Sequence, residues 1–269
     1  MLNQTMTDQP LISVVTVVYN DVKNLENTMN SVFSQTYKNV DYIVIDGGST
    51  DGTVDIIKKH ASKLKYWTSG PDKGIYDAMN KAIAAASREG WMNFMNSGDK
   101  FASPDVLDKI GYALSQQAGV DILYGNAEIQ YEGFGVPFKI QPLHTLWKYS
   151  PFCHQAAFIK ASLMKEYQYD LQYKIGADHD LFFRTYKNNG IFSYINVLVC
   201  LFDGREGTTK KRIVQAIQDK KNIALKYEPG AGKWLYYQFY LAYIKFVIAA
   251  KRLLGTKLTA TITRLLKKK

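Results

Sequence analysis

The chain has 269 residues, of which 46% are hydrophobic, and it contains two cysteines. This size and composition exclude a wholly disordered protein and allow one large domain with a core, or a domain with an appendage. Cys153 and Cys200 lie in apolar sequence, which indicates small core residues in a reducing compartment rather than a disulfide framework. Residues 1–10 have no basic start and no apolar run, so we interpret them as a lead segment and not as a signal peptide.

The net charge of +10 is concentrated at one end of the chain. Residues 233–269 hold nine Lys and Arg and no Asp or Glu, which leaves 25 basic and 24 acidic groups in the other 232 residues. This distribution argues against a core that binds nucleic acid. It predicts instead a tail that meets an anionic surface.

Apolar runs and helix-periodic segments alternate through the first 120 residues. The pattern predicts buried strands over 11–19, 42–46, 65–68 and 91–95, and helices over 24–34, after Asp51, over 75–87 and over 104–117. Such alternation is typical of an α/β fold with a mainly parallel sheet that is covered by helices.

The rhythm changes after residue 121. The sequence predicts a hairpin from 121–130 and 134–141, then a helix over 178–188, a strand over 192–202 and a helix over 209–227. The breaker at 228–232 sets a boundary. We therefore expect a catalytic domain over 11–228, with halves 11–120 and 121–228, and a separate tail over 233–269.

Three predicted strands end in polar residues. Tyr19 follows the first strand, Asp46 ends the second, and Asp99 follows the strand at 91–95. In open α/β sheets the carboxyl ends of strands form the ligand crevice. Tyr19 can stack on a base, Asp46 can accept from an imide or a ribose hydroxyl, and Asp99 can bind a divalent cation. The alternative is that each is an ordinary turn or cap residue.

The loop Gly70–Gly74 precedes a helix and contains Lys73. A helix N-terminus beside a lysine and a glycine is suited to an anion. The same loop is equally consistent with an ordinary helix start.

Four segments together resemble family 2 glycosyltransferases. They are Ser-Val-Val-Thr-Val-Val-Tyr-Asn, Ile-Asp-Gly-Gly-Ser-Thr-Asp-Gly-Thr, Asp-Lys-Gly-Ile-Tyr-Asp-Ala-Met-Asn-Lys and Phe-Met-Asn-Ser-Gly-Asp. The likeness covers roughly residues 11–205 and is greatest to the bacterial branch that builds exopolysaccharide, capsule and O-antigen repeat units. It implies the Rossmann-like GT-A fold, a nucleotide-diphosphate-sugar donor (UDP first), Mn²⁺ or Mg²⁺, and inversion at the anomeric carbon.

The resemblance also implies site residues. Asp99 would bind the metal, with His154 as a second candidate, and the donor site would contain Thr16, Val17, Tyr19, Asp46, Asp72, Lys73, Asn96, Ser97 and Arg205. Two departures stand out. Asn96-Ser97-Gly98-Asp99 replaces the Asp-x-Asp-Asp of many relatives, so weak metal binding is expected without donor. Met79 replaces a frequent Arg, whose role Lys73 or an Arg from elsewhere in the chain would assume.

The catalytic base is expected in the second half. Inverting transfer is a single displacement in which a carboxylate takes the proton of the acceptor hydroxyl. The segment Gly176–Arg184 resembles the acceptor-side motif of the family and places Asp178 at the base. The alternative for Asp178 is a helix N-cap, and the alternative for Asp180 is a surface partner of Arg184. The alternative for His154 is a buried structural histidine. By the resemblance, the segment that contains Arg205 would close over the donor diphosphate, and the alternative is an ordinary exposed loop.

The tail is rich in aromatic and basic residues. Residues 234–250 would span about 25 Å as a helix, which is short of a ~30 Å hydrocarbon core, and Lys245 lies in the middle. Aromatic density here and the amphipathic pattern over 257–269 favour contact with an anionic membrane surface. The alternative is packing on the catalytic domain. We expect a cytoplasmic enzyme, peripheral to the inner membrane face, that glycosylates a saccharide on a polyprenyl diphosphate.

Two rival functions remain. One is a membrane-bound sugar-nucleotide-binding or scaffold protein with little activity, because the acidic motif is reduced. The other is a nucleotidyltransferase, which the absence of a Gly-rich basic loop after the first strand disfavours. A Gly-x-Gly-x-x-Gly motif is also absent there, which argues against a dinucleotide-dependent dehydrogenase.

Overall fold

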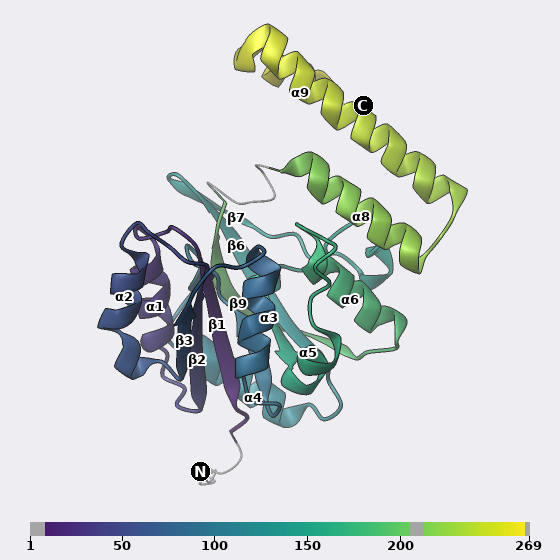
Figure 1. Cartoon of the computed structure of the whole chain (residues 1–269). Coiled ribbons are helices and arrows are strands. Elements are labelled where there is room, and N and C mark those ends of the chain that lie inside the picture. The colour runs from purple at the N-terminus through teal and green to yellow at the C-terminus, as the bar shows by residue number, and fades with distance from the viewer. Residues whose placement is uncertain (1–8, 205–211, 267–269) are drawn as a thin grey trace.

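In the computed structural model, residues 9–204 and 212–266 are described, with side chains through Ala250. The described residues form a nine-stranded sheet between layers of helices, and two helices, α8 and α9, stack beyond it (Figure 1). The strand order is β3-β2-β1-β4-β8-β6-β9-β5, and β7 pairs with β6.

The first strands of the chain pair in parallel, as the alternating pattern predicts. Strands β1, β2, β3 and β4 cover Ile12–Val18, Val40–Asp46, Tyr66–Ser69 and Trp91–Phe94, and helices α1, α2 and α3 cover Leu25–Phe33, Thr53–Lys59 and Ile75–Ala85, with a short 3-10 helix at Ala61–Lys63. All seven residues of β1 are buried because both of its faces are covered. Val14 packs in one core cluster and Val15 in the other.

The chain from Lys100 to Asp203 adds mostly antiparallel pairs to the sheet, although its two longest strands, β6 and β9, pair in parallel. It comprises β5 (Lys100–Phe101), α4 (Val106–Gln116), β6 (Ile122–Tyr131), β7 (Phe134–Pro137), β8 (Ala157–Lys160), α5 (Ala161–Tyr167), α6 (Ala177–Lys187) and β9 (Phe192–Asp203), with 3-10 turns at Leu143–Thr145 and His154–Ala156. The predicted hairpin is β6–β7, and it ends earlier than expected, at Pro137. Strand β8 lies antiparallel between β4 and β6, so both halves share one sheet. The sequence did not reveal β5, β8 or α5 because they are too short to show a period.

Helices cover both faces of the sheet. Leu25 of α1 and Leu107 of α4 belong to the core cluster on one face. Met79 of α3, Met164 of α5 and Leu181 of α6 belong to the cluster on the other face. This covering leaves the carboxyl ends of β1, β2 and β4 to loops, which is where the candidate site lies.

Helix α8 covers Ile213–Tyr227 and α9 covers Ala231–Leu266. Instead of two amphipathic segments, the tail is one helix of 36 residues. Tyr237 and Leu241 of α9 are buried against Ile217 and Ala224 of α8, and the Tyr237 hydroxyl donates to the Trp147 carbonyl at 2.5 Å. The first part of the tail therefore packs on the rest of the protein. None of the helices in the described residues has the length and apolar character needed to span a bilayer.

Candidate functional site

The ends of three parallel strands meet at one edge of the sheet. Val18 pairs with Asp46, and the Gly47 N–H donates to the Val18 carbonyl at 2.9 Å. On the other side of β1, the Ser97 N–H donates to the Val17 carbonyl at 3.3 Å. The segments that follow β1, β2 and β4 therefore lie side by side, as the polar strand ends predicted.

Asp46 shapes the turn that follows β2. Its side chain is fully buried, and Oδ2 accepts from the backbone N–H groups of Gly48 and Ser49 at 3.0 and 2.9 Å. The hydroxyls of Ser49 and Ser69 donate to the same carboxylate at 2.5 and 2.6 Å. These bonds explain how a charged group is tolerated without exposure. Contact of Asp46 with a donor stays a prediction, since its carboxylate lies behind the turn.

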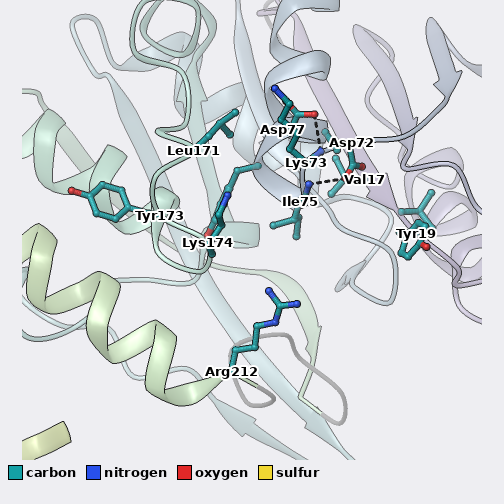
Figure 2. A pocket seen from close by; sticks show the side chains of 14 residues that line it. Val17, Tyr19, Asp72, Lys73, Ile75, Asp77, Leu171, Tyr173, Lys174 and Arg212 are labelled. Atoms are coloured by element: carbon teal, nitrogen blue, oxygen red, sulfur yellow. Dashed lines mark hydrogen bonds between the residues drawn. The ribbon is translucent and has the colours of Figure 1, made fainter.

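A cavity of about 400 Å³ opens beside this edge (Figure 2). One wall consists of the end of β1 and the start of α3, and it contains Val17, Tyr19, Asp72, Lys73 and Tyr76. Tyr19 is 65% exposed, so its ring is available for stacking on a ligand. The volume lies within the usual range of small-molecule sites.

Gly47 lies where the loops that bear Tyr19 and Asp72 contact the turn after β2. A Cβ atom added to Gly47 would lie 2.6 Å from Asp72 Oδ2 and 3.3 Å from Tyr19 Cδ2. A larger residue would therefore push these two side chains apart. The Asp72 carboxylate is oriented by the Gly74 N–H, which donates to Oδ1 at 2.8 Å.

The opposite wall comes from the second half of the chain. Tyr173 and Lys174 lie on the loop before α6, and Arg212 directly precedes α8; all three line the cavity, and Figure 2 shows the ring of Tyr173 pointing away from the other labelled residues. Lys73, Lys174 and Arg212 form no ion pair with another described residue. Unpaired cations on both walls favour an anionic ligand.

Asp99 lies at the same strand edge but is buried, with 4% exposure. Its Oδ2 accepts from the Gln155 amide at 2.8 Å and its Oδ1 from the Asp203 N–H at 2.9 Å. Burial raises the pKa of Asp99 to about 7, and these two donors oppose the rise. The carboxyl groups of Asp203 and Asp21 add to the increase in pKa.

The surroundings of Asp99 supply oxygen atoms but not a complete metal site. Ser97 donates to Asp21 Oδ2 at 2.7 Å, and the buried Asn96 Oδ1 has no hydrogen-bond partner. Oxygen donors of this kind suit Mg²⁺ or Mn²⁺. Within residues 9–204 and 212–250, however, no three His, Cys, Asp or Glu side chains are grouped to hold a metal ion.

His154 is a buried member of an aromatic cluster. Its Nε2 lies 2.8 Å from the Tyr169 hydroxyl, and its ring stacks on Phe94 at 5.2 Å. Burial lowers the pKa of His154. These contacts support the structural alternative, and the metal role of His154 stays a prediction.

Asp178 lies in the first turn of α6 and is in contact with the cavity wall through Tyr76. The helix N-cap is Gly176, so the alternative reading of Asp178 as N-cap is wrong. Asp178 Oδ1 accepts from the Tyr76 hydroxyl at 2.8 Å and from the His179 N–H at 2.9 Å. Asp178 is half-buried and does not itself line the cavity, so its role as general base stays a prediction.

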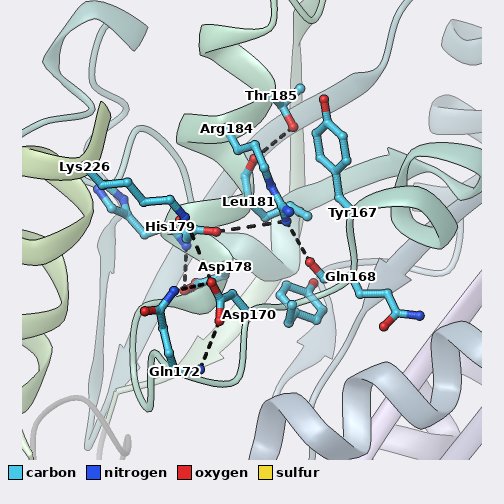
Figure 3. A network of polar contacts seen from close by, with 12 residues as sticks. Tyr167, Gln168, Asp170, Gln172, Asp178, His179, Leu181, Arg184, Thr185 and Lys226 are labelled. Atoms are coloured by element: carbon cyan, nitrogen blue, oxygen red, sulfur yellow. Dashed lines mark hydrogen bonds and ion pairs between the residues drawn. The ribbon is translucent and has the colours of Figure 1, made fainter. Parts of the chain in front are cut away.

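Buried polar contacts join α6 to α8 (Figure 3). Asp180 is fully buried, and its Oδ1 accepts from Lys226 Nζ at 3.0 Å and from the Tyr227 hydroxyl at 2.9 Å. Arg184 pairs with Asp180 Oδ2 at 4.0 Å, as the i, i+4 spacing suggested, but Asp180 is buried and does not lie on the helix surface. Asp219 of α8 accepts the Ile175 N–H at 2.9 Å. Helix α8 thus holds the loop and helix that bear Asp178.

The predicted donor residues fall into three groups. Val17, Tyr19, Asp72 and Lys73 line the cavity. Asp46, Asn96 and Ser97 are not among the residues that line it, and Arg205 is outside the described residues. Thr16 is fully buried, and its hydroxyl donates to the Met95 carbonyl at 2.7 Å, so its side chain does not face the cavity.

Several residues at the site had no role in the sequence analysis. Tyr76 lies inside one of the motifs that carry the family resemblance, and Gln155 lies beside His154. Their spacing in the sequence does not show which residue either side chain contacts. Other such residues are Asp21, Tyr173, Lys174 and Arg212. Only the folded chain brings them to this edge.

The chain is similar to known glycosyltransferases over most of its length. The family description Glycosyl transferase family 2 matches residues 13–174. An uncharacterized glycosyltransferase of Mycobacterium tuberculosis is 37% identical over 187 residues, 67% of this chain and 70% of that protein. A PGL/p-HBAD biosynthesis glycosyltransferase of the same species is 28% identical over 72% of this chain and 77% of that protein.

Solved structures show the same fold. S. aureus TarS in complex with UDP-GlcNAc gives a TM-score of 0.65 at 20% identity, covering 83% of this chain and 69% of that one. The mannosyltransferase PcManGT of Pyrobaculum calidifontis, in complex with GDP-Man and Mn²⁺, also gives 0.65, at 15% identity over 97% of this chain and 81% of that one. With the matched region covering more than half of its length, the chain belongs to glycosyltransferase family 2.

Proposed function

We propose that this protein is an inverting glycosyltransferase that moves one sugar from a nucleotide-diphosphate donor, UDP first, to a lipid-linked saccharide. One observation carries the proposal: the cavity joins Tyr19 and Asp72, from donor motifs, to Tyr76, which contacts Asp178. Relatives named for PGL/p-HBAD biosynthesis, and a neighbour in complex with UDP-GlcNAc, support a glycolipid product and a UDP donor.

The proposed reaction is a single displacement. The nucleoside stacks on Tyr19, and the acceptor hydroxyl gives its proton to Asp178. The acceptor oxygen forms a bond to the anomeric carbon, while the bond to the diphosphate breaks and its electron pair leaves with the nucleotide diphosphate. Lys73, Lys174 and, by the resemblance, Arg205 neutralise the charge on that leaving group.

Dependence on Mn²⁺ or Mg²⁺ belongs to this proposal, with Asp99 as the ligand and His154 as the second candidate. A bound cation would stabilise the leaving diphosphate. The neighbour in complex with GDP-Man and Mn²⁺ supports it. The test is turnover after EDTA treatment, then with each metal restored. Full activity in EDTA would show that the cations of the chain suffice.

The function is tested with a panel of UDP-, GDP- and dTDP-sugars and synthetic prenyl-diphosphate saccharides as acceptors. Release of nucleotide diphosphate and the mass of the product are measured, and NMR gives the anomeric configuration. We expect one donor to support acceptor-dependent release with inversion. Retention of configuration would contradict the mechanism, and release of pyrophosphate would favour the nucleotidyltransferase.

The rival of a sugar-nucleotide-binding or scaffold protein makes a different prediction. Such a protein would bind UDP but would neither transfer the sugar nor hydrolyse the donor. Donor hydrolysis above the uncatalysed rate, lost in Asp178→Asn, would exclude it.

The tail supports attachment to a membrane. Leu235, Phe239 and Phe246 of α9 are exposed and lie within about 40° of one another around the helix. This stripe faces away from Tyr237 and Leu241, which pack on α8. Helix α9 therefore has one apolar side that is occupied and another that is free, in a segment with nine cations and no acids. We propose that the free side lies in the headgroup region of an anionic bilayer at the inner membrane face.

A flotation assay tests this attachment. The full chain should float with vesicles containing phosphatidylglycerol, and less well at high salt. Phe239→Asp together with Phe246→Asp should stay folded, because both side chains are exposed, but should lose flotation. Tyr112→Asp, at an exposed aromatic of α4, is the matched control. Flotation of the double variant at the wild-type level would contradict the proposal.

A further inference from the structure

We propose that Tyr76 positions Asp178, so that one carboxylate oxygen is held by the tyrosine while the other takes the proton of the acceptor. This inference rests on the proposed function, because it assumes that Asp178 is the base. Tyr76 belongs to the donor half of the chain, and Asp178 lies 102 positions later, in the acceptor half.

The Tyr76 side chain has a fixed place between the cavity and α6. It is 8% exposed and lines the cavity, and its ring lies 5.3 Å from that of Tyr169. Its hydroxyl oxygen is 2.8 Å from Asp178 Oδ1. Burial raises the pKa of Tyr76 well above its usual value, so the hydroxyl stays protonated as a donor.

The two oxygens of Asp178 have different surroundings. Oδ1 accepts from Tyr76 and from the His179 N–H. Oδ2 makes no hydrogen bond to another described residue, and it is not fully buried. With Oδ1 held, rotation of the carboxylate is restricted, and Oδ2 is the atom left to accept a proton from the sugar hydroxyl.

The Tyr76 hydroxyl has a second acceptor within reach, to which it can donate when Asp178 becomes protonated. The Ile175 carbonyl also lies 2.8 Å from the Tyr76 oxygen. A single O–H proton bonds one acceptor at a time, and the ionised carboxylate is the stronger one. Once Oδ2 has gained the proton of the acceptor, Tyr76 can donate to Ile175 instead. Neither protonation state of Asp178 leaves the buried hydroxyl without an acceptor.

The test is Tyr76→Phe, which removes the hydroxyl and keeps the ring. We expect kcat to fall about 10- to 100-fold, the factor that a hydrogen bond to a charged group provides. The KM for the donor and the Kd for UDP should stay within about two-fold, since donor contacts are untouched. Rates are measured with the donor and acceptor pair that the panel selects.

A double-mutant cycle separates positioning from a structural role. In the Asp178→Asn background, Tyr76→Phe should cause no further loss, because the group it positions is gone. Tyr37→Phe is the control, since that buried hydroxyl donates to the Pro10 carbonyl away from the cavity, and its kcat should be unchanged.

Three outcomes are decisive. Wild-type kcat in Tyr76→Phe would overturn the inference. A loss that adds in full to that of Asp178→Asn, or a parallel loss of UDP binding, would also overturn it by showing a structural role. If Asp178→Asn itself kept wild-type turnover, the assignment of the base would fail, and that failure is visible without any Tyr76 variant.

Discussion

The two walls of the cavity hold their polar groups in different ways. On the donor side several bonds are local, since the Ser49 N–H donates to Asp46, three residues away, and the Gly74 N–H to Asp72, two residues away, although Ser69 also donates to Asp46 from 23 residues away. On the acceptor side they are long-range, because Ile175 donates to Asp219 across 44 residues, and Tyr227 to Asp180 across 47. The donor wall is therefore a set of short motifs, whereas the acceptor wall exists only when α8 is docked.

Variants of the two walls separate the loss of the proposed base, the loss of contacts with α8 and the loss of contacts with the donor. The largest effect is expected for Asp178→Asn, which removes the proposed base and keeps the shape of the side chain. Transfer should fall at least about 10³-fold, within the range for general-base groups. Isothermal titration should give a Kd for UDP like that of wild type, because Tyr19 and Asp72 are unchanged. Unchanged turnover would remove Asp178 from its role.

Asp180→Ala tests whether the acceptor wall depends on α8. The change leaves Lys226 and Tyr227 without the buried carboxylate that accepts from both. We expect the free energy of unfolding to fall by about 2 to 3 kcal/mol, less than for a fully buried pair because Lys226 is partly exposed. Urea denaturation measures this loss. Asp55→Ala, whose side chain is 82% exposed, should change stability by less than about 0.5 kcal/mol.

His179→Leu tests the pH dependence of the same region. Burial and the nearby Lys220 lower the pKa of His179 to about 3, whereas an unfolded histidine titrates near 6.5. Between pH 6.5 and pH 3 the unfolded state therefore binds one more proton than the folded state. The free energy of unfolding consequently falls as the pH falls below 6.5. At pH 5 this proton binding lowers the free energy of unfolding of the wild type by about 2 kcal/mol.

Denaturation at pH 5 and pH 7 checks the effect. The leucine variant should lose less stability than wild type on acidification, whatever its packing at pH 7. His144→Leu, at an exposed position, should retain the wild-type slope. Equal slopes for His179→Leu and wild type would contradict the assignment.

The smallest effect is expected on the donor wall. Tyr19→Ala should weaken UDP binding about 10-fold, as loss of one stacking contact on a base would. Stability should be nearly unchanged because the ring is 65% exposed. Tyr112→Ala, 62% exposed on α4, is the control for both measurements. A UDP affinity that is unaffected by Tyr19→Ala would place the nucleoside elsewhere.

Much of the fold was predictable, and the reason is physical. The run Ile12–Val18 has β-branched residues on both faces, which defines a strand covered on both sides, and α3 repeats apolar residues at helical spacing. Strand β8 was not predictable, since four apolar residues have no measurable period and its place between β4 and β6 depends on long-range pairing. The tail was predicted as two segments and is one helix.

By itself, the sequence determined the α/β class, the polar strand ends and the family, because these are properties of short segments and their order. Only the tertiary structure decided which side chains face the cavity. It buried Thr16 and Asp46, placed Gln155 on Asp99, and joined Tyr76 to Asp178. Such contacts link residues far apart in the chain, and whether a polar group faces a ligand or its own backbone depends on packing that no local pattern records.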